Sequence, residues 1–291
     1  MTPLVLLFGM LDEYLTYLEL KNCSKYTLRN YRFMLKRFFV FYHGKLEDIN
    51  LVEVFRFMCY LKEIGLSFNY RQSHLIAIRS FLKYCLLHDI PTLHYGKLEV
   101  VKKEYTETVF LERAEMEKLF QITHEKKLLS LRNTAIFRLL YSTGCRVSEL
   151  ANLNRDQVGK DEVSILGKGQ KWRIVFISPE ASKAVRDYLD FRKDKYKPLF
   201  ISHGRGGNRK DRRISVTMIQ KMVRTYGRQA GLYKRITPHR MRHTFATHLL
   251  RNGAPLPAIQ QLLGHSSLAT TQMYLHCTDP YLKSVFQENH R

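Results

Sequence analysis

The sequence lacks the long apolar runs and paired cysteines that mark several protein classes. No stretch approaches the roughly 20 apolar residues that a transmembrane helix needs, so no membrane-spanning segment is predicted. The apolar run Leu4–Gly9 has no basic residues before it, which predicts the start of a helix rather than a signal peptide. The five cysteines are far apart and include no C-x-x-C pair, which is typical of reduced thiols in a cytoplasmic protein.

Two families of catalytic site are also missing. The chain has no G-x-x-x-x-G-K-[ST] loop, which excludes a phosphate-binding loop of the ATPase type. It has no cluster of Asp and Glu residues that would suggest a two-metal nuclease. His239 and His243 have the spacing of metal ligands, but the intervening cations Arg240 and Arg242 argue against a divalent ion. We therefore expect neither a metal nor a cofactor.

Acidic residues are scarce relative to basic ones. The chain has 48 Lys and Arg residues against 26 Asp and Glu residues, which leaves a formal net charge of +22 spread along its length. Such a charge repels itself unless a partner neutralises it, and a nucleic acid does so with release of counterions. The charge therefore predicts a nucleic-acid partner and disfavours a membrane surface. With 291 residues, 45% of them hydrophobic, the chain can form two domains with cores of their own.

Residues 1–92 are predicted to form an all-α domain. Ser24 is a candidate N-cap, and further helices are expected over Leu11–Leu20, over Leu51–Ile64 and after a second candidate cap, Ser67. The helix after Ser24 has apolar residues at spacings of three, four and seven, which predicts one buried face. These residues are Leu28, Tyr31, Leu35, Phe38, Phe39 and Tyr42.

Basic side chains lie beside the apolar faces of two of these helices. A basic face next to a core face suits a DNA backbone, although a solvated charged face explains either helix taken alone. The candidate phosphate contacts are Lys25, Arg29, Arg32, Lys36, Arg71, Arg79 and Lys83.

Residues 93–108 lose the helical periodicity and are predicted to be an extended linker. Residues 109–291 are predicted to form a mixed α+β domain, mainly helical with a small antiparallel sheet. Its hairpin would pair Glu162–Leu166 with Trp172–Ile177 around a glycine-containing turn. The expected helices are Glu112–Thr123, Leu131–Ser142, Pro179–Lys195, Val216–Ala230, Pro238–Asn252, Pro257–Leu263 and Leu268–Tyr274.

Side chains suited to binding a phosphate are scattered through this second domain. Taken singly, each has a structural explanation: a charge at a helix end, a solubilising lysine at a hairpin tip, a loop histidine or a core tyrosine. Their flanking sequences change that assessment, because four motifs occur in a fixed order. They are T-G-x-R-V-S-E-L at Thr143–Leu150, G-K-G-x-K-x-R at Gly167–Arg173, H-x-x-R-H-T-F-A-T at His239–Thr247 and L-L-G-H-S-x-x-x-T-T-x-x-Y at Leu262–Tyr274.

These motifs resemble those of the tyrosine recombinases, or phage-type integrases, and most of all their Xer-like branch. The resemblance covers nearly the whole chain and reaches the level of motifs from about residue 131 to 276. It implies a core-type DNA-binding domain followed by a catalytic domain. It also implies six catalytic residues, which are Arg146, Lys168, His239, Arg242, His265 and the nucleophile Tyr274.

The implied chemistry is cleavage and rejoining of DNA through a 3′-phosphotyrosyl intermediate. The two arginines and the second histidine would stabilise charge on the nonbridging phosphate oxygens. The first histidine would take part in removing the tyrosine proton, and the hairpin lysine would protonate the leaving 5′ oxygen. Further DNA contacts are expected in the catalytic domain from Lys171, Arg173, Arg205, Arg209 and Arg213.

By the same resemblance, the partners are double-stranded DNA recombination sites in a bacterial nucleoid. A homo-tetramer on two sites is expected, with segment 279–291 exchanged between subunits and a second recombinase or accessory protein as a further partner. Two alternatives stay open: a DNA topoisomerase of the same chemistry, and a non-catalytic DNA-binding protein of the same fold. Tyr226 and Tyr281 are the next tyrosines to consider as nucleophiles.

Overall fold

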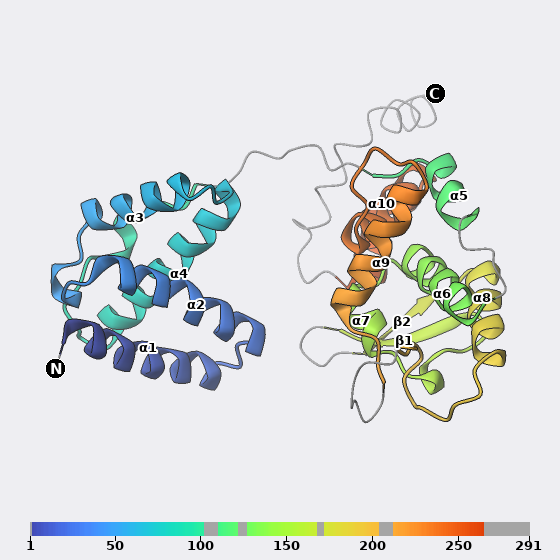
Figure 1. Ribbon diagram of the computed structural model, residues 1–291, viewed down its shortest axis with the longest axis horizontal. Helices are drawn as coiled ribbons and strands as arrows, with labels where there is room; N and C mark the ends of the chain where they lie inside the picture. Colours follow the sequence, from blue (N-terminus) through green and yellow to red (C-terminus); the bar gives the residue numbers. More distant parts are fainter. Residues whose placement is uncertain (1, 102–109, 122–126, 168–171, 204–211, 265–291) are drawn as a thin grey trace. The chain divides into compact units, whose positions relative to one another are not determined.

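The computed structural model describes residues 2–101, 110–121, 127–167, 172–203 and 212–264. The chain divides into two compact units, Met1–Tyr105 and Thr106–Arg291 (Figure 1). Within the described ranges, no helix combines the length and the apolar composition needed to cross a membrane.

The described elements of the first unit are all helical, as predicted. They are α1 (Pro3–Leu20), α2 (Lys25–Tyr42), η1 (Leu46–Asp48), α3 (Leu51–Glu63), α4 (Phe68–Leu87) and η2 (Tyr95–Lys97). Helix α1 packs on α2, and α4 packs on α1, α2 and α3. The core between them is aromatic: the rings of Phe38 and Phe57 lie 5.2 Å apart, and those of Phe39 and Phe81 lie 5.3 Å apart.

The two predicted N-caps of this unit differ in whether their side chains make a capping hydrogen bond. Ser24 caps α2, and its hydroxyl accepts a hydrogen bond from the backbone N–H of Thr27. Ser67 stands at the N-cap position of α4, but its side chain makes no capping hydrogen bond. Helix α1 begins at Pro3, so the apolar run Leu4–Gly9 starts the helix and the predicted stretch Leu11–Leu20 is its continuation, with Leu7 extending the buried face of Leu11.

The segment after α4 differs from the expected extended linker. It contains the short helix η2, and Leu98 is buried in the core of the first unit. The first part of residues 93–108 therefore packs on the helical unit, and residues 102–108 lie outside the described residues.

The second unit combines helices with one hairpin, as predicted. Its elements are α5 (Arg113–Gln121), α6 (Leu128–Thr143), α7 (Val147–Asn152), η3 (Arg155–Gln157), β1 (Glu162–Leu166), β2 (Trp172–Phe176), α8 (Pro179–Asp190), α9 (Val216–Gln229), α10 (Pro238–Arg251) and α11 (Leu256–Leu263). Helix α6 packs against α8 and α10 (Figure 1). Strands β1 and β2 are antiparallel, with Val163 opposite Val175 and Ile165 opposite Arg173. The expected helix Leu268–Tyr274 lies outside the described residues.

Helix α6 ends at a glycine that two requirements impose. Gly144 has a φ of +58°, a left-handed conformation that other residues rarely adopt. A Cβ atom added there would lie 2.2 Å from Cδ1 of Phe245 on α10. Glycine therefore lets α10 approach the turn that leads from α6 to α7.

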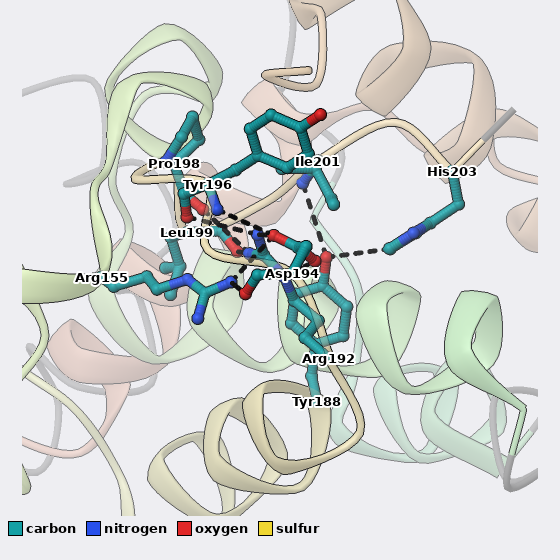
Figure 2. A network of polar contacts seen from close by, with 9 residues as sticks. All are labelled: Arg155, Tyr188, Arg192, Asp194, Tyr196, Pro198, Leu199, Ile201 and His203. Atoms are coloured by element: carbon teal, nitrogen blue, oxygen red, sulfur yellow. Dashed lines mark hydrogen bonds and ion pairs between the residues drawn. The ribbon is translucent and has the colours of Figure 1, made fainter. Parts of the chain in front are cut away.

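A buried arginine organises the chain after α8 (Figure 2). The side chain of Arg192 is 0% exposed and donates hydrogen bonds to the carbonyls of Pro198 and Leu199, at 2.9 and 2.8 Å, and to the carboxylate of Asp194. Asp194 also accepts a hydrogen bond of 3.0 Å from Arg155 of η3. This network ties the segment after α8 to η3, which closely follows α7 in the chain.

The Asp194 carboxylate gives a testable stability prediction. Its hydrogen bonds with Arg192, reduced in effect by burial, lower its pKa from 3.8 to about 2. A carboxyl with a depressed pKa stabilises the fold above its unfolded pKa, and the effect is lost as the pH falls toward 2. Asp194→Asn should therefore cost roughly 2 kcal/mol in urea unfolding at pH 7, and clearly less at pH 3.

Asp187→Asn is the matched control, because Asp187 forms an exposed pair with Lys183 on α8. Removing such a surface pair should change the free energy of unfolding by less than about 0.5 kcal/mol. Equal losses for the two variants at pH 7 would contradict the importance of the buried network.

Candidate active site

Arg146 sits at the N-terminus of α7, immediately after the glycine turn. Glu149, in the first turn of α7, accepts the backbone N–H of Arg146 at 2.8 Å and its Nη1 at 3.0 Å. The Glu149 side chain is 5% exposed, whereas that of Arg146 is 38% exposed. The guanidinium is therefore held by a buried carboxylate and still reaches the surface.

Arg242 lies on α10 and is 4% exposed. Its Nη1 donates to the carbonyl of Gly144 at 2.8 Å, and its Nη2 donates to the carbonyl of Leu263 at 2.7 Å. The side chain thus joins the turn before α7 to the end of α11. A planar guanidinium makes such a bridge with donors on two separate nitrogens held in a fixed arrangement, whereas a lysine has a single nitrogen with rotatable donors.

His239 lies on the first turn of α10, one turn before Arg242. Although it reaches solvent, desolvation by the surrounding protein lowers its pKa, and the charges of Arg242 and Arg146 lower it further. The imidazole is therefore neutral at pH 7 and able to accept a proton.

The structure brings three of the six expected catalytic residues together. Arg146 and Arg242 act on His239 electrostatically, and the Nη2 of Arg146 lies 3.5 Å from the carbonyl of Gly264. The other three expected catalytic residues, Lys168, His265 and Tyr274, lie outside the described residues.

Glu149 is a site residue to which sequence reasoning assigned no role. Burial by itself raises its pKa, but hydrogen bonds from Arg173 and from Arg146 outweigh burial and lower it. The carboxylate is therefore ionised. The sequence signal for it is incomplete: Glu149 has the spacing of a capping box three residues after the N-cap, but Arg146 stands there in place of the usual Ser or Thr.

Arg173 was expected to contact DNA, and the structure gives it an internal partner. Its Nη1 and Nη2 donate to the two carboxylate oxygens of Glu149 at 3.0 and 2.8 Å. Its side chain is 14% exposed, because Arg173 lies on the same inward face of β2 as the buried Val175.

Arg213 also differs from the expected DNA contact. It donates to the carbonyls of Ala151 and Leu153 at 3.2 and 3.0 Å, and to Oδ1 of Asn154 at 2.7 Å. These contacts hold the C-terminal end of α7. The expected contacts Lys171, Arg205 and Arg209 lie outside the described residues.

The first unit presents most of its expected phosphate contacts at the surface. On α2, one of these side chains, Arg32, forms an ion pair with Asp12. On α4, Arg79 and Lys83 lie over the ring of Tyr95, at 5.9 and 5.6 Å from its centre. The exposed residues are Lys25, Arg29, Arg32, Lys36 and Lys83, and the half-buried ones are Arg71 and Arg79.

Comparison with known protein families gives matches in both units. The model described as "Phage integrase family" matches residues 109–280. The model described as "Phage integrase, N-terminal SAM-like domain" matches residues 11–88.

Curated proteins and solved structures give similar matches. "Tyrosine recombinase XerA" of Thermococcus kodakarensis is 34% identical over 279 residues, 95% of this chain and 93% of that protein. "Tyrosine recombinase XerD" of Oceanobacillus iheyensis is 33% identical over an alignment of 299 positions, which covers 96% of this chain and 97% of that protein. The crystal structure of XerA recombinase matches with a TM-score of 0.55 and 30% identity, covering 97% of this chain and 98% of that one. XerH recombinase bound to a palindromic difH substrate shares the fold, with a TM-score of 0.74 and 21% identity over 93% of this chain and 82% of that one.

The position of His239 generates a prediction about its titration. In the protein without DNA, an NMR titration of the histidine ring protons should give His239 a pKa below the ordinary value near 6.5. Arg146→Gln should raise that pKa, because it removes one of the nearby positive charges. Arg186→Gln is the control, since Arg186 lies on α8 with its side chain on Ser182. An unchanged His239 pKa in Arg146→Gln would show that the two side chains do not interact.

Proposed function

The chain belongs to the phage integrase family of tyrosine recombinases, and we propose that Tyr274 is the nucleophile with which this site-specific recombinase cuts DNA. The observation that carries the assignment is the joint placement of Arg146, Arg242 and His239 around the turn at Gly144. Lys168, His265 and Tyr274 complete the proposed set from their positions in the sequence motifs.

Stabilising the phosphate is the role proposed for the two arginines. Attack on a phosphodiester builds negative charge on its nonbridging oxygens, and fixed donors lower the barrier most when they are already in place. Arg146 and Arg242 are permanently charged and are held by hydrogen bonds to Glu149, Gly144 and Leu263. One such donor is worth about 3 kcal/mol of barrier. His265 would provide a third donor.

Proton movement is the second requirement. A tyrosine hydroxyl has a pKa near 10 and attacks well only when it is in line and loses its proton during attack. We assign the proton acceptor to His239, which its surroundings keep neutral at pH 7. As the Tyr274 oxygen bonds to phosphorus, the bond to the 5′ oxygen breaks, and Lys168 protonates that oxygen.

The product of this step is a 3′-phosphotyrosyl bond and a free 5′ hydroxyl. The covalent bond conserves the energy of the broken phosphodiester. A 5′ hydroxyl from the second DNA site can therefore attack the phosphotyrosine, release Tyr274 and reseal the strand without ATP. This exchange accounts for recombination rather than simple cleavage.

DNA binding is proposed to involve both units. Residues 1–92 would form the core-type binding domain, and residues 109–291 the catalytic domain, joined by residues 93–108. The exposed side chains Lys25, Arg29, Arg32, Lys36 and Lys83 are proposed phosphate contacts, which position the protein without reading sequence. We further propose a homo-tetramer on two sites at the nucleoid, with segment 279–291 exchanged between subunits.

The alternative function as a topoisomerase and the alternative nucleophile Tyr226 have less support. Relatives at 33–34% identity over nearly the whole chain are named recombinases, which disfavours a topoisomerase. Tyr226 is a poor alternative nucleophile, because its hydroxyl accepts a hydrogen bond of 2.9 Å from Asn133 and its ring packs on Phe137. Tyr281 lies outside the described residues.

The nucleophile can be tested with a nicked DNA site that traps the covalent intermediate. Tyr274→Phe should form no covalent protein–DNA adduct, because it lacks the attacking oxygen, and should bind the site with unchanged affinity. Tyr226→Phe is the matched control and should still form the adduct. Adduct formation by Tyr274→Phe would show that another residue attacks the phosphate. If both variants folded and neither formed the adduct, Tyr226 would also be needed for cleavage, and its assignment as a residue outside the chemistry would be wrong.

A further inference from the structure

Arg173 lies where three parts of the second unit meet. It belongs to β2, its two Nη atoms bind the Glu149 carboxylate of α7, and its Nε donates to the carbonyl of Leu262 in α11 at 3.3 Å. Gly264 follows closely, and a Cβ atom at that position would lie 3.1 Å from Cδ of Arg173. The side chain therefore links the hairpin, the helix that carries Arg146 and the end of the helix that precedes His265.

The Glu149 carboxylate is shared between two arginines. Each of its oxygens accepts one hydrogen bond from Arg146 and one from Arg173, all between 2.8 and 3.0 Å. The three side chains together carry one net positive charge. Without Arg173, the buried carboxylate would neutralise Arg146 alone, and the pair of Arg146 and Glu149 would carry no net charge.

We propose that Arg173 is a positioning residue for strand cleavage, which acts by balancing Glu149 so that Arg146 keeps its charge and orientation for the phosphate. This inference rests on the proposed function, in which Arg146 stabilises the reacting phosphate. In this role Arg173 itself does not touch the DNA. Its guanidinium hydrogen bonds also fix the hairpin against α7 and α11.

The strand geometry favours this role over direct phosphate contact. Arg173 shares its face of β2 with Val175 and lies opposite Ile165, and both of these side chains are buried. Trp172, Ile174 and Phe176 occupy the other face of the strand and are exposed. A lysine at position 173 would keep the charge, but it would lose the two-pronged contact with Glu149 and the hydrogen bond to Leu262.

The test separates cleavage from binding, using the full-length protein and a nicked DNA site. At saturating DNA, Arg173→Gln should slow single-turnover formation of the covalent adduct by between about 10-fold and 100-fold. Its affinity for DNA, and the dependence of that affinity on salt, should match wild type. Arg173→Lys should form the adduct at a rate between those of wild type and Arg173→Gln, because it keeps the positive charge but loses the bidentate contact with Glu149.

Two further variants show whether charge balance is the cause. The double variant Glu149→Gln with Arg173→Gln should cleave faster than Arg173→Gln alone, because it removes the unbalanced carboxylate. Arg155→Gln is the matched control, because Arg155 also pairs with a carboxylate, that of Asp194, outside the site. It should leave the cleavage rate of the bound complex unchanged.

Three results would overturn the proposal. The first is wild-type cleavage by Arg173→Gln at saturating DNA. The second is weaker binding with a salt slope reduced by about 1, which would make Arg173 a phosphate contact. The third is a double variant slower than Arg173→Gln. If Arg173→Gln does not fold, Arg173→Lys decides: a slower cleavage step at unchanged affinity supports the proposal, and a wild-type rate overturns it. Failure of the wild-type protein to form any adduct would instead reject the proposed function.

Discussion

Burial of the Glu149 carboxylate is the constraint on which the described part of the site depends. A buried charge is costly unless it is paired and hydrogen-bonded, so this carboxylate requires all the donors around it. Those donors come from the backbone and side chain of Arg146 and from the fork of Arg173. The start of α7 and the inner face of β2 are therefore tied together by one acid. In the proposed mechanism Glu149 does not contact the substrate, yet it sets the position of Arg146, which does.

Arginines also bind the ends of helices and turns in this unit. The last carbonyls of a helix carry partial negative charge and lack partners within the helix. Arg242 binds Leu263 at the end of α11, Arg213 binds Ala151 and Leu153 at the end of α7, and Arg192 binds the carbonyls of Pro198 and Leu199. A large positive charge therefore serves the fold as well as the nucleic acid. Counting basic residues predicts the class of partner, but it does not distinguish arginines that bind carbonyls and carboxylates of the protein itself from basic side chains that are exposed.

Much of the fold could be predicted from local sequence patterns, but contacts between residues distant in sequence could not. Helix α2 and both strands follow from periodicity and turn chemistry that span fewer than about 20 residues. Helix α7 was not predicted, because six residues are too few to show a period. The pairing of Glu149 with Arg173 joins positions 24 residues apart, and no local rule indicates it. The catalytic candidates were found because their motifs are short. Their supports, including Arg213, required the packed structure.

The same electrostatics link phosphate binding to proton transfer in the proposed mechanism. Desolvation, together with the charges of Arg242 and Arg146, lowers the pKa of His239 in the protein without DNA. A bound phosphate adds negative charge beside those arginines, and opposite charge nearby favours the protonated form of a histidine. The proton affinity of His239 therefore rises when the scissile phosphate arrives, which is when the nucleophile must lose its proton. In the proposed mechanism, desolvation and the same cations that stabilise the transition state together favour the neutral base until substrate is present.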